Sequence, residues 1–173
     1  MIRIAPLAAL VSLVLLGAQI AHAQQWVKYQ PDGAGYRVEF PAKPVENTQD
    51  ITTKVGPVKT RTSAVEVGDK VFMTVHSFYP TDVAMSDPQT NLDGVRNGSV
   101  HNVNGKLLSE ERLNISNAPA RRLLIDMPRS NQAAEALMIL DGNRLYQAVY
   151  VGPPGTENTP EAKRFLSSFA LLH

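Results

Sequence analysis

Two adjacent arginines, Arg121 and Arg122, are the residues of this sequence best suited to hold an anion. A guanidinium group forms paired hydrogen bonds with a carboxylate or a phosphate. Because neighbouring residues of a strand point to opposite faces, only one of the two would reach a given ligand. Arg121 would share its face with Leu123 and Ile125 and cover core with its stem, whereas Arg122 would share a face with Asp126 and pair with it. Both are candidate binding residues, although the pattern favours structural ion pairing.

Histidine chemistry has three candidates in residues 24–173, namely His76, His101 and His173. His101 falls near the end of a predicted helix, where the negative end of the helix dipole favours a cation. It is the third candidate binding residue, with a solvated surface histidine as the favoured alternative. His76 falls in a predicted central strand, where we expect a partly buried side chain that is hydrogen-bonded to a neighbour. The sequence contains no His-x-His, His-x-x-x-His or Glu-x-x-His pattern, so no metal site is predicted.

Catalytic patterns are missing from the sequence. There is no cysteine, and no Gly-x-Ser-x-Gly motif marks a serine nucleophile. Glu110 and Glu111 are adjacent, so on a strand they would face opposite sides and could not act together on one bond. The loop at Gly152–Gly155 lacks the lysine of a phosphate-binding loop, and its two prolines remove backbone donors. We therefore predict no catalytic residue, no cofactor and no enzymatic activity.

The elements that would position these residues are mostly strands. Alternation of apolar and polar residues predicts a strand at Tyr36–Phe40, and Gly56-Pro57 predicts a hairpin between its flanking Thr- and Val-rich segments. The segment Val71–Tyr79 is apolar on both faces and should be central. Asp141-Gly142 is the strongest hairpin signal. Further strands are expected at residues 26–29, 107–115, 120–127, 133–140 and 145–151.

Two helices are predicted between and after these strands. Ser86 or Asp87 would cap the first, with Pro88 in its first turn, and two glycines four residues apart, Gly94 and Gly98, would let it lie close to a sheet. The second would begin after Thr159 and bury the face formed by Ala162, Phe165, Leu166 and Phe169. The expected class is α+β, with a mainly antiparallel sheet of about six to eight strands packed with helices.

The first 23 of the 173 residues are typical of a cleavable export signal. Arg3 is followed by the apolar stretch Ile4–Gly17, and Ala21-His22-Ala23 predicts cleavage after Ala23. Residues 24–173 would then form a single domain, with no stable membrane anchor. Loss of Arg3 leaves equal numbers of basic and acidic residues, which argues against nucleic acid as a partner. We expect a periplasmic or secreted location and favour the bacterial periplasm, because the chain has no cysteine for disulfides.

Several segments resemble the Mog1/PsbP-like superfamily, in particular its uncharacterised exported bacterial members. Tyr36–Pro44 is similar to the V-x-F-P-x-x-P opening of that superfamily. The segments Leu92–Gly98, Asn104–Leu108, Arg144–Gln147 and Phe165–Phe169 are similar to its first helix with the following strand, its closing hairpin and its C-terminal helix. The resemblance implies an α/β/α sandwich. Exported members often carry Gly-x-Pro-Gly before Arg-Glu, whereas this chain has Asn-Ala-Pro-Ala-Arg-Arg at 117–122, so no functional residue is transferred.

Three functions remain open at this point. Known relatives in the resemblance bind Ran GTPase, support photosystem II or belong to the bacterial envelope, so the fold alone does not choose a role. The leading hypothesis is a non-enzymatic accessory or protein-binding module of the bacterial envelope, whose partner is an envelope protein. The alternatives are a periplasmic binder of a small molecule, held in a pocket between helix and sheet, and a hydrolase whose site the sequence does not mark.

Overall fold

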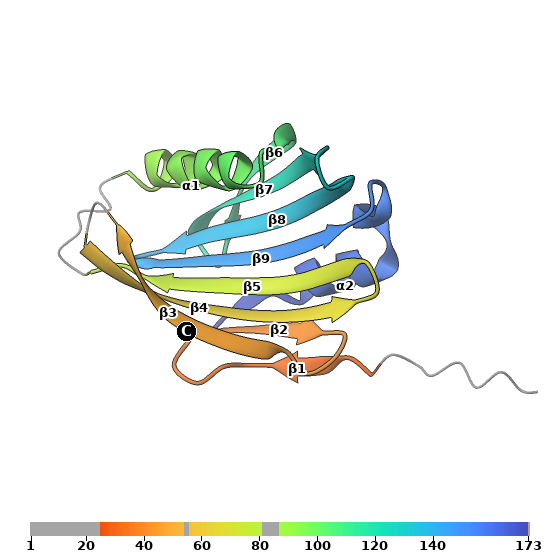
Figure 1. The fold of residues 1–173 in the computed structure, drawn as a ribbon. Helices are drawn as coiled ribbons and strands as arrows, with labels where there is room; N and C mark the ends of the chain where they lie inside the picture. Colours follow the sequence, from red (N-terminus) through yellow and green to blue (C-terminus); the bar gives the residue numbers. More distant parts are fainter. Residues whose placement is uncertain (1–24, 54–55, 81–86, 173) are drawn as a thin grey trace, which may run out of the picture.

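The computed structural model describes residues 25–53, 56–80 and 87–172, which form two sheets and two α-helices (Figure 1). The predicted export signal, Met1–Ala23, lies outside the described residues. The helices are α1 (Pro88–Asn102) and α2 (Pro160–Ser168), and a short 3₁₀ turn, η1, spans Thr156–Asn158. The strands are β1 (Val27–Tyr29), β2 (Tyr36–Phe40), β3 (Val45–Thr53), β4 (Gly56–Val67), β5 (Lys70–Phe78), β6 (Lys106–Ile115), β7 (Ala118–Met127), β8 (Gln132–Asp141), β9 (Arg144–Gly152) and β10 (Ala170–Leu171).

The larger sheet has seven strands in the order β3-β4-β5-β9-β8-β7-β6, and every neighbouring pair is antiparallel. The expected α+β class and mainly antiparallel sheet are therefore confirmed. Strand β5 lies inside the sheet, between β4 and β9, as its apolar residues on both faces predicted. The smaller sheet joins β1, β2 and β10. Of these, only the two-residue strand β10 was not predicted from the sequence.

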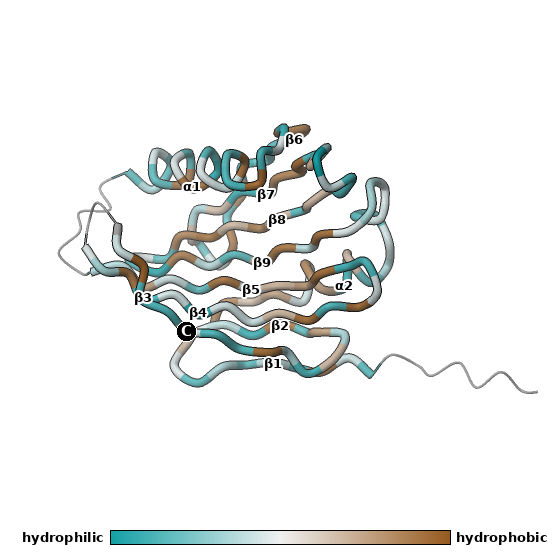
Figure 2. The backbone as a smooth tube through the Cα atoms, in the orientation of Figure 1, coloured by the Kyte–Doolittle hydropathy of each residue, from teal (hydrophilic) through white to brown (hydrophobic). Residues whose placement is uncertain are grey.

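The helices lie on opposite faces of the seven-stranded sheet and bury two separate cores (Figures 1 and 2). On one face, Leu92 of α1 packs with Leu123 and Met138 from β7 and β8. On the other face, α2 and the small sheet pack over β5 and β9, and Phe165 of α2 contacts Phe40 and Phe72. This layering is the α/β/α sandwich that the resemblance implied.

The first helix begins where the sequence predicted it. The Gln89 backbone N–H donates a hydrogen bond of 2.9 Å to Oδ1 of Asp87, and Pro88 occupies the first turn, where its missing N–H costs no hydrogen bond. The prediction that Gly94 and Gly98 approach the sheet is wrong. A Cβ at either position would meet nothing within 4 Å, so both glycines point into open space and the helix packs through Leu92 instead.

Candidate functional site

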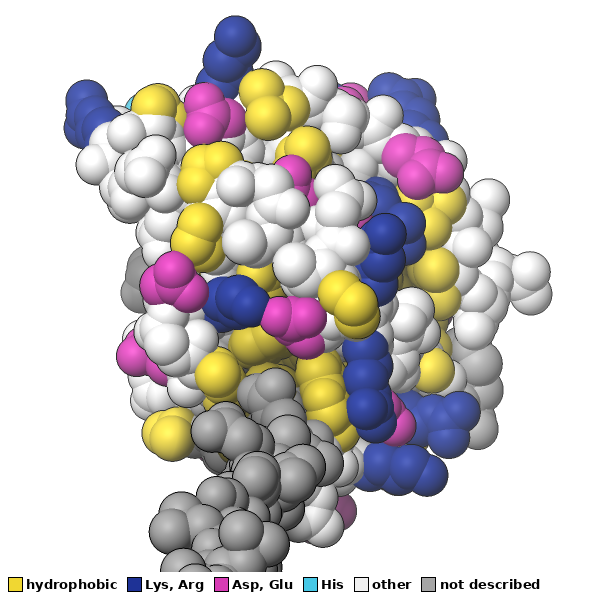
Figure 3. Space-filling model, turned by 90° about the vertical axis from the view of Figure 1, so that its right-hand side faces the viewer, with side chains coloured by type: hydrophobic (Ala, Val, Ile, Leu, Met, Phe, Trp, Pro, Cys, Tyr) yellow, Lys and Arg dark blue, Asp and Glu magenta, His cyan; other side chains and the backbone are white. Residues whose placement is uncertain are grey.

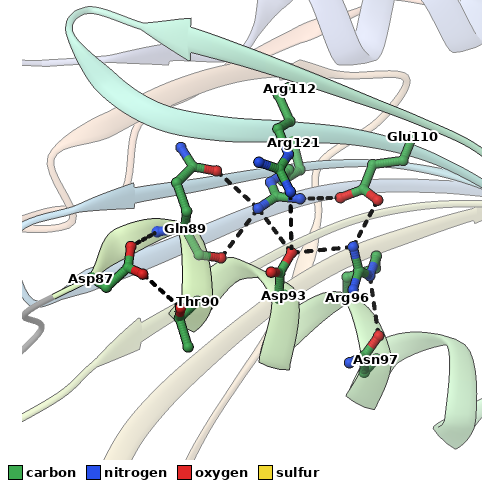
Figure 4. Close-up of polar contacts among 9 residues, drawn as sticks. All are labelled: Asp87, Gln89, Thr90, Asp93, Arg96, Asn97, Glu110, Arg112 and Arg121. Atoms are coloured by element: carbon green, nitrogen blue, oxygen red, sulfur yellow. Dashed lines mark hydrogen bonds and ion pairs between the residues drawn. The ribbon is translucent and has the colours of Figure 1, made fainter.

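Arg121 lies under α1 and is the largest fully buried side chain among the described residues. The structure confirms that it shares the α1 face of the sheet with Leu123 and Ile125. Its Nη1 donates to Oε1 of Glu110 on β6. Its Nη2 donates to the backbone carbonyl of Gln89 at 3.1 Å and to Oε1 of that side chain at 2.8 Å (Figure 4). Strand and helix are therefore joined through one guanidinium group.

Two further charged side chains of α1 complete this buried ion network (Figure 4). Oδ1 of Asp93 lies 2.9 Å from Nη2 of Arg121, and Arg96 Nη1 lies 2.7 Å from Oε2 of Glu110 and 3.1 Å from Oδ1 of Asp93. Burial acts to raise the pKa of Glu110, but the hydrogen bonds from Arg96 and Arg121 outweigh it and hold that pKa below its usual range. Glu110 is thus ionised at neutral pH. We interpret the network as structural, because a ligand has no access to a side chain that is 0% exposed.

Arg122 points to the opposite face of β7. Its side chain is 45% exposed, and its Nε lies 3.8 Å from Oε1 of Glu135 on β8. The predicted partner, Asp126, was wrong because four residues along a strand span about 13 Å, whereas Glu135 lies on the neighbouring strand. A small hollow of about 130 Å³ beside this pair is also lined by Glu157. Burial raises the pKa of Glu135, while Arg122 acts to lower it and Glu157 to raise it.

His101 is exposed in the last turn of α1, as its predicted position near a helix end suggested. With Arg96 and Arg129 it lines an open groove of about 500 Å³ between α1 and the start of β6. The structure does not bring the three candidate residues together. Arg121 lies under α1, Arg122 lies on the opposite face of the sheet, and His101 lies at the end of α1. Their role in binding stays a prediction.

His76 is more deeply buried than the partly buried side chain that the sequence predicted. It is 1% exposed, and within the described part of the chain its Nε2 has no hydrogen-bond partner. Instead, its ring stacks on Tyr146, with centroids 4.7 Å apart and planes at 4°, and lies 4.1 Å from the ring of Phe78. Burial, followed by the charges of Arg144 and Arg61, lowers the pKa of His76 to about 4. The ring is therefore neutral at neutral pH and part of the aromatic core.

Among the described residues, the sheet face that carries α1 extends beyond the strands that the helix contacts most. The helix contacts β7 and β8, while β9, β5 and β4 continue the same face beyond it (Figure 1). We define the open sheet face by the partly exposed side chains Val71, Met73, Val75, Val149 and Val151. Val149 and Val151 also pack against the edge of the core under α1, so the face begins where that core ends. The residues between them, such as Phe72 and Tyr150, are buried on the other side. The sequence indicated this face only indirectly, by making β5 apolar on both sides.

The open sheet face contains a row of paired residues that crosses several strands. Met73 lies opposite Val149 on β9 and opposite Ala64 on β4, and Ala64 lies opposite Val45 on the edge strand β3. Val45 is 78% exposed. Apolar side chains that are contiguous and exposed mark interaction sites more often than scattered ones do, so this face is the candidate functional site.

Charges on the end of the molecule seen in Figure 3 are interspersed, with acidic, basic and hydrophobic side chains next to one another. Elsewhere on the surface, single ion pairs balance charge locally, as between Lys70 and Glu161, whose Nζ and Oε1 are 2.5 Å apart. Within the described residues, no group of three or more histidine, aspartate or glutamate side chains is placed to hold a metal ion. No described helix is long and apolar enough to cross a membrane.

Comparison with known proteins gives a likeness in fold. No family model matches the chain, and no curated protein matches its sequence. The solution structure of cyanobacterial PsbP (CyanoP) from Synechocystis sp. PCC 6803 superposes with a TM-score of 0.58 at 14% identity and covers 91% of this chain and 98% of that one. A crystal structure of PA94, a protein of unknown function from Pseudomonas aeruginosa, matches with a TM-score of 0.39 at 11% identity and covers 76% of this chain and 85% of that one. The chain therefore has a PsbP-like fold, as the sequence predicted.

Proposed function

We propose that this chain is an exported, non-enzymatic accessory module of the bacterial envelope that binds another envelope protein through its open sheet face. The observation that carries the proposal is the apolar row from Val149 through Met73 and Ala64 to Val45, which continues past the edge of α1. A module that worked alone would gain by covering these side chains, because each buried apolar side chain contributes about 1.5–3 kcal/mol.

Two other features support the proposal. The titratable side chains His76 and Arg121 are buried in structural contacts, whereas catalytic groups need access to substrate. The resemblance to accessory proteins and the PsbP-like fold agree with this role. Export rests on the sequence pattern of residues 1–23 alone.

The test compares capture of envelope proteins by two matched double variants. Met73→Lys with Val149→Glu charges the centre of the open sheet face, and because the two residues are directly opposite, the new charges are placed to pair across the strands. Since Val149 also packs against the core under α1, urea unfolding first checks that the variant is folded. The control, Val67→Lys with Leu108→Glu, charges two exposed apolar residues outside that face. Tagged proteins are recovered from the producing organism's own envelope fraction and analysed by native mass spectrometry.

We expect the unchanged protein and the control to retain the same protein partner, and the Met73→Lys/Val149→Glu variant to lose it. Equal capture by all three would contradict the role of the open sheet face. A retained small molecule with no protein partner would instead favour the small-molecule binder.

A further inference from the structure

Strand β3 is an edge strand of the seven-stranded sheet and, among the described residues, has no pairing strand on its outer side. It ends the strand order, spans nine residues and pairs with β4 in an unbroken register from Val45 to Thr53. Every side chain from Val45 to Thr52 is exposed. Because a strand uses alternate backbone groups for each neighbour, the outer side of β3 presents a row of N–H and C=O groups with no pairing strand among the described residues (Figure 1).

The opposite edge, β6, carries the features that prevent strand pairing. Its register shifts at a bulge between Leu107 and Ser109, and Arg96 of α1 bonds to its residue Glu110. Lys106, Glu110, Glu111 and Arg112 also distribute both signs of charge along it. Natural proteins protect free edges with such bulges, lysines and covering elements. Strand β3 contains no lysine, arginine or proline and has no register shift, so only one of the two edges is left open to pairing.

We propose that β3 accepts an extended segment of the partner protein as an eighth strand, with basic side chains opposite Glu46 and Asp50. This inference rests on the proposed function and names the mode of binding. Glu46 and Asp50 lie on one face of β3, while Val45 and Ile51 lie on the other and are 78% and 41% exposed. A pairing segment therefore meets acidic groups on one face and apolar groups on the other.

Charge selects this occupant over a second copy of the chain. In an antiparallel pair of β3 strands centred on Thr48, Glu46 of each copy would lie opposite Asp50 of the other, and like charges directly opposite are unfavourable. On β4, the residues opposite Asp50 and Thr48 are Lys59 and Arg61. A basic strand on the outer side of β3 would continue this alternation of charge from strand to strand.

The apolar face of the added strand would extend the open sheet face. Val45 is the last member of the row that runs through Ala64 and Met73. Alternate apolar residues in the partner segment would lie beside Val45 and Ile51 and lengthen that row by one strand. Main-chain hydrogen bonds would supply affinity, and the alternating side chains would supply specificity, as in other cases of strand addition.

The test uses a pair of synthetic peptides and a charge-reversed protein. The first peptide, Thr-Val-Lys-Val-Thr-Val-Lys-Val-Thr with blocked ends, spaces two lysines to match Glu46 and Asp50. The second has glutamate in place of both lysines. The protein variant is Glu46→Lys with Asp50→Lys, which alters only exposed side chains. Binding is measured by titration, and its position by hydrogen exchange of backbone amides.

We expect the lysine peptide to slow amide exchange in β3 and to bind the unchanged protein about tenfold more tightly than the glutamate peptide. The difference arises because the lysine peptide forms two favourable cross-strand charge pairs where the glutamate peptide would place like charges opposite each other. The variant should reverse that preference. Equal binding of both peptides, or protection away from β3, would overturn the inference. So would a dimer of the protein alone that protects β3, since the occupant would then be a second copy.

Failure of this inference is distinguishable from failure of the proposed function. If the Glu46→Lys/Asp50→Lys variant still captures the envelope partner that Met73→Lys/Val149→Glu loses, the open sheet face binds without strand addition. If neither variant affects capture, both proposals fail.

Discussion

Replacing the buried Arg121 with methionine tests how α1 is held on the sheet. Removal of one partner from a fully buried ion pair costs about 3–5 kcal/mol. Here the side chain of Glu110 is 19% exposed and that of Asp93 is 37% exposed, and Arg96 remains in contact with both acids. Water and Arg96 would therefore compensate part of the loss. We expect Arg121→Met to lower the free energy of unfolding by about 2–3 kcal/mol.

The assay is urea unfolding followed by circular dichroism at neutral pH. The matched control is Arg112→Met, because the Arg112 side chain is 63% exposed and its Nη2 lies 4.0 Å from Oδ1 of Asp93. Exposed pairs contribute about 0–1 kcal/mol, so this variant should unfold almost as the unchanged protein does. Adding Glu110→Leu to Arg121→Met should restore part of the lost stability, since an apolar pair replaces a carboxylate that has lost one of its two arginine partners. An Arg121→Met protein no less stable than Arg112→Met would refute the structural role of the network.

Three further predictions concern stability. His76 has a pKa of about 4 in the folded protein against 6.5 for the free side chain, so the unfolded chain binds the proton more tightly. The free energy of unfolding of the unchanged protein should therefore fall by about 3 kcal/mol as the pH falls from 6.5 to 4. In urea titrations at several pH values, His76→Phe should show a weaker dependence of this free energy on pH. Gly94→Ala should raise the unfolding free energy by up to about 1 kcal/mol, because the glycine is helical and faces open space; a decrease in melting temperature would contradict this placement of α1. Gly35→Ala should lower the unfolding free energy by about 1–3 kcal/mol, because φ is +75° and the added Cβ would lie 2.9 Å from Nη1 of Arg144; thermal unfolding no different from that of the unchanged protein would exclude this contact.

The elements most accurately predicted from the sequence are those that local chemistry determines. Asp141-Gly142 joins β8 to β9 as expected, with Gly142 at φ +57°, a conformation in which glycine has no steric cost. Asp87, one of the two predicted candidates for the N-cap of α1, caps that helix, and the apolar face of α2 is also found. Elements that depend on distant pairing were missed. The two-residue β10 exists only because it pairs with Arg37 and Tyr36 of β2, and a segment that short has no periodicity of its own.

The candidate site shows the same limit. The sequence placed Arg121 beside Leu123 and Ile125, because two-residue periodicity along one strand is local information. Its partners on α1 and β6 depend on how a helix crosses the sheet, which no spacing in the chain records. The aromatic surroundings of His76 likewise depend on Tyr146, which stacks against it from the neighbouring strand. The open sheet face was indicated only by the apolar residues on both sides of β5, and its extent depends on the position of α1 over β7 and β8.

The most direct test of the account is hydrogen exchange of the protein in complex with the envelope partner that it retains. If the partner binds through the open sheet face and β3, amide exchange should slow in β3, β4, β5 and β9 and stay unchanged in α2, because α2 packs on the opposite face of the sheet. Protection confined to α2 or to the groove beside His101, with no change in β3 or β5, would contradict binding through the open sheet face.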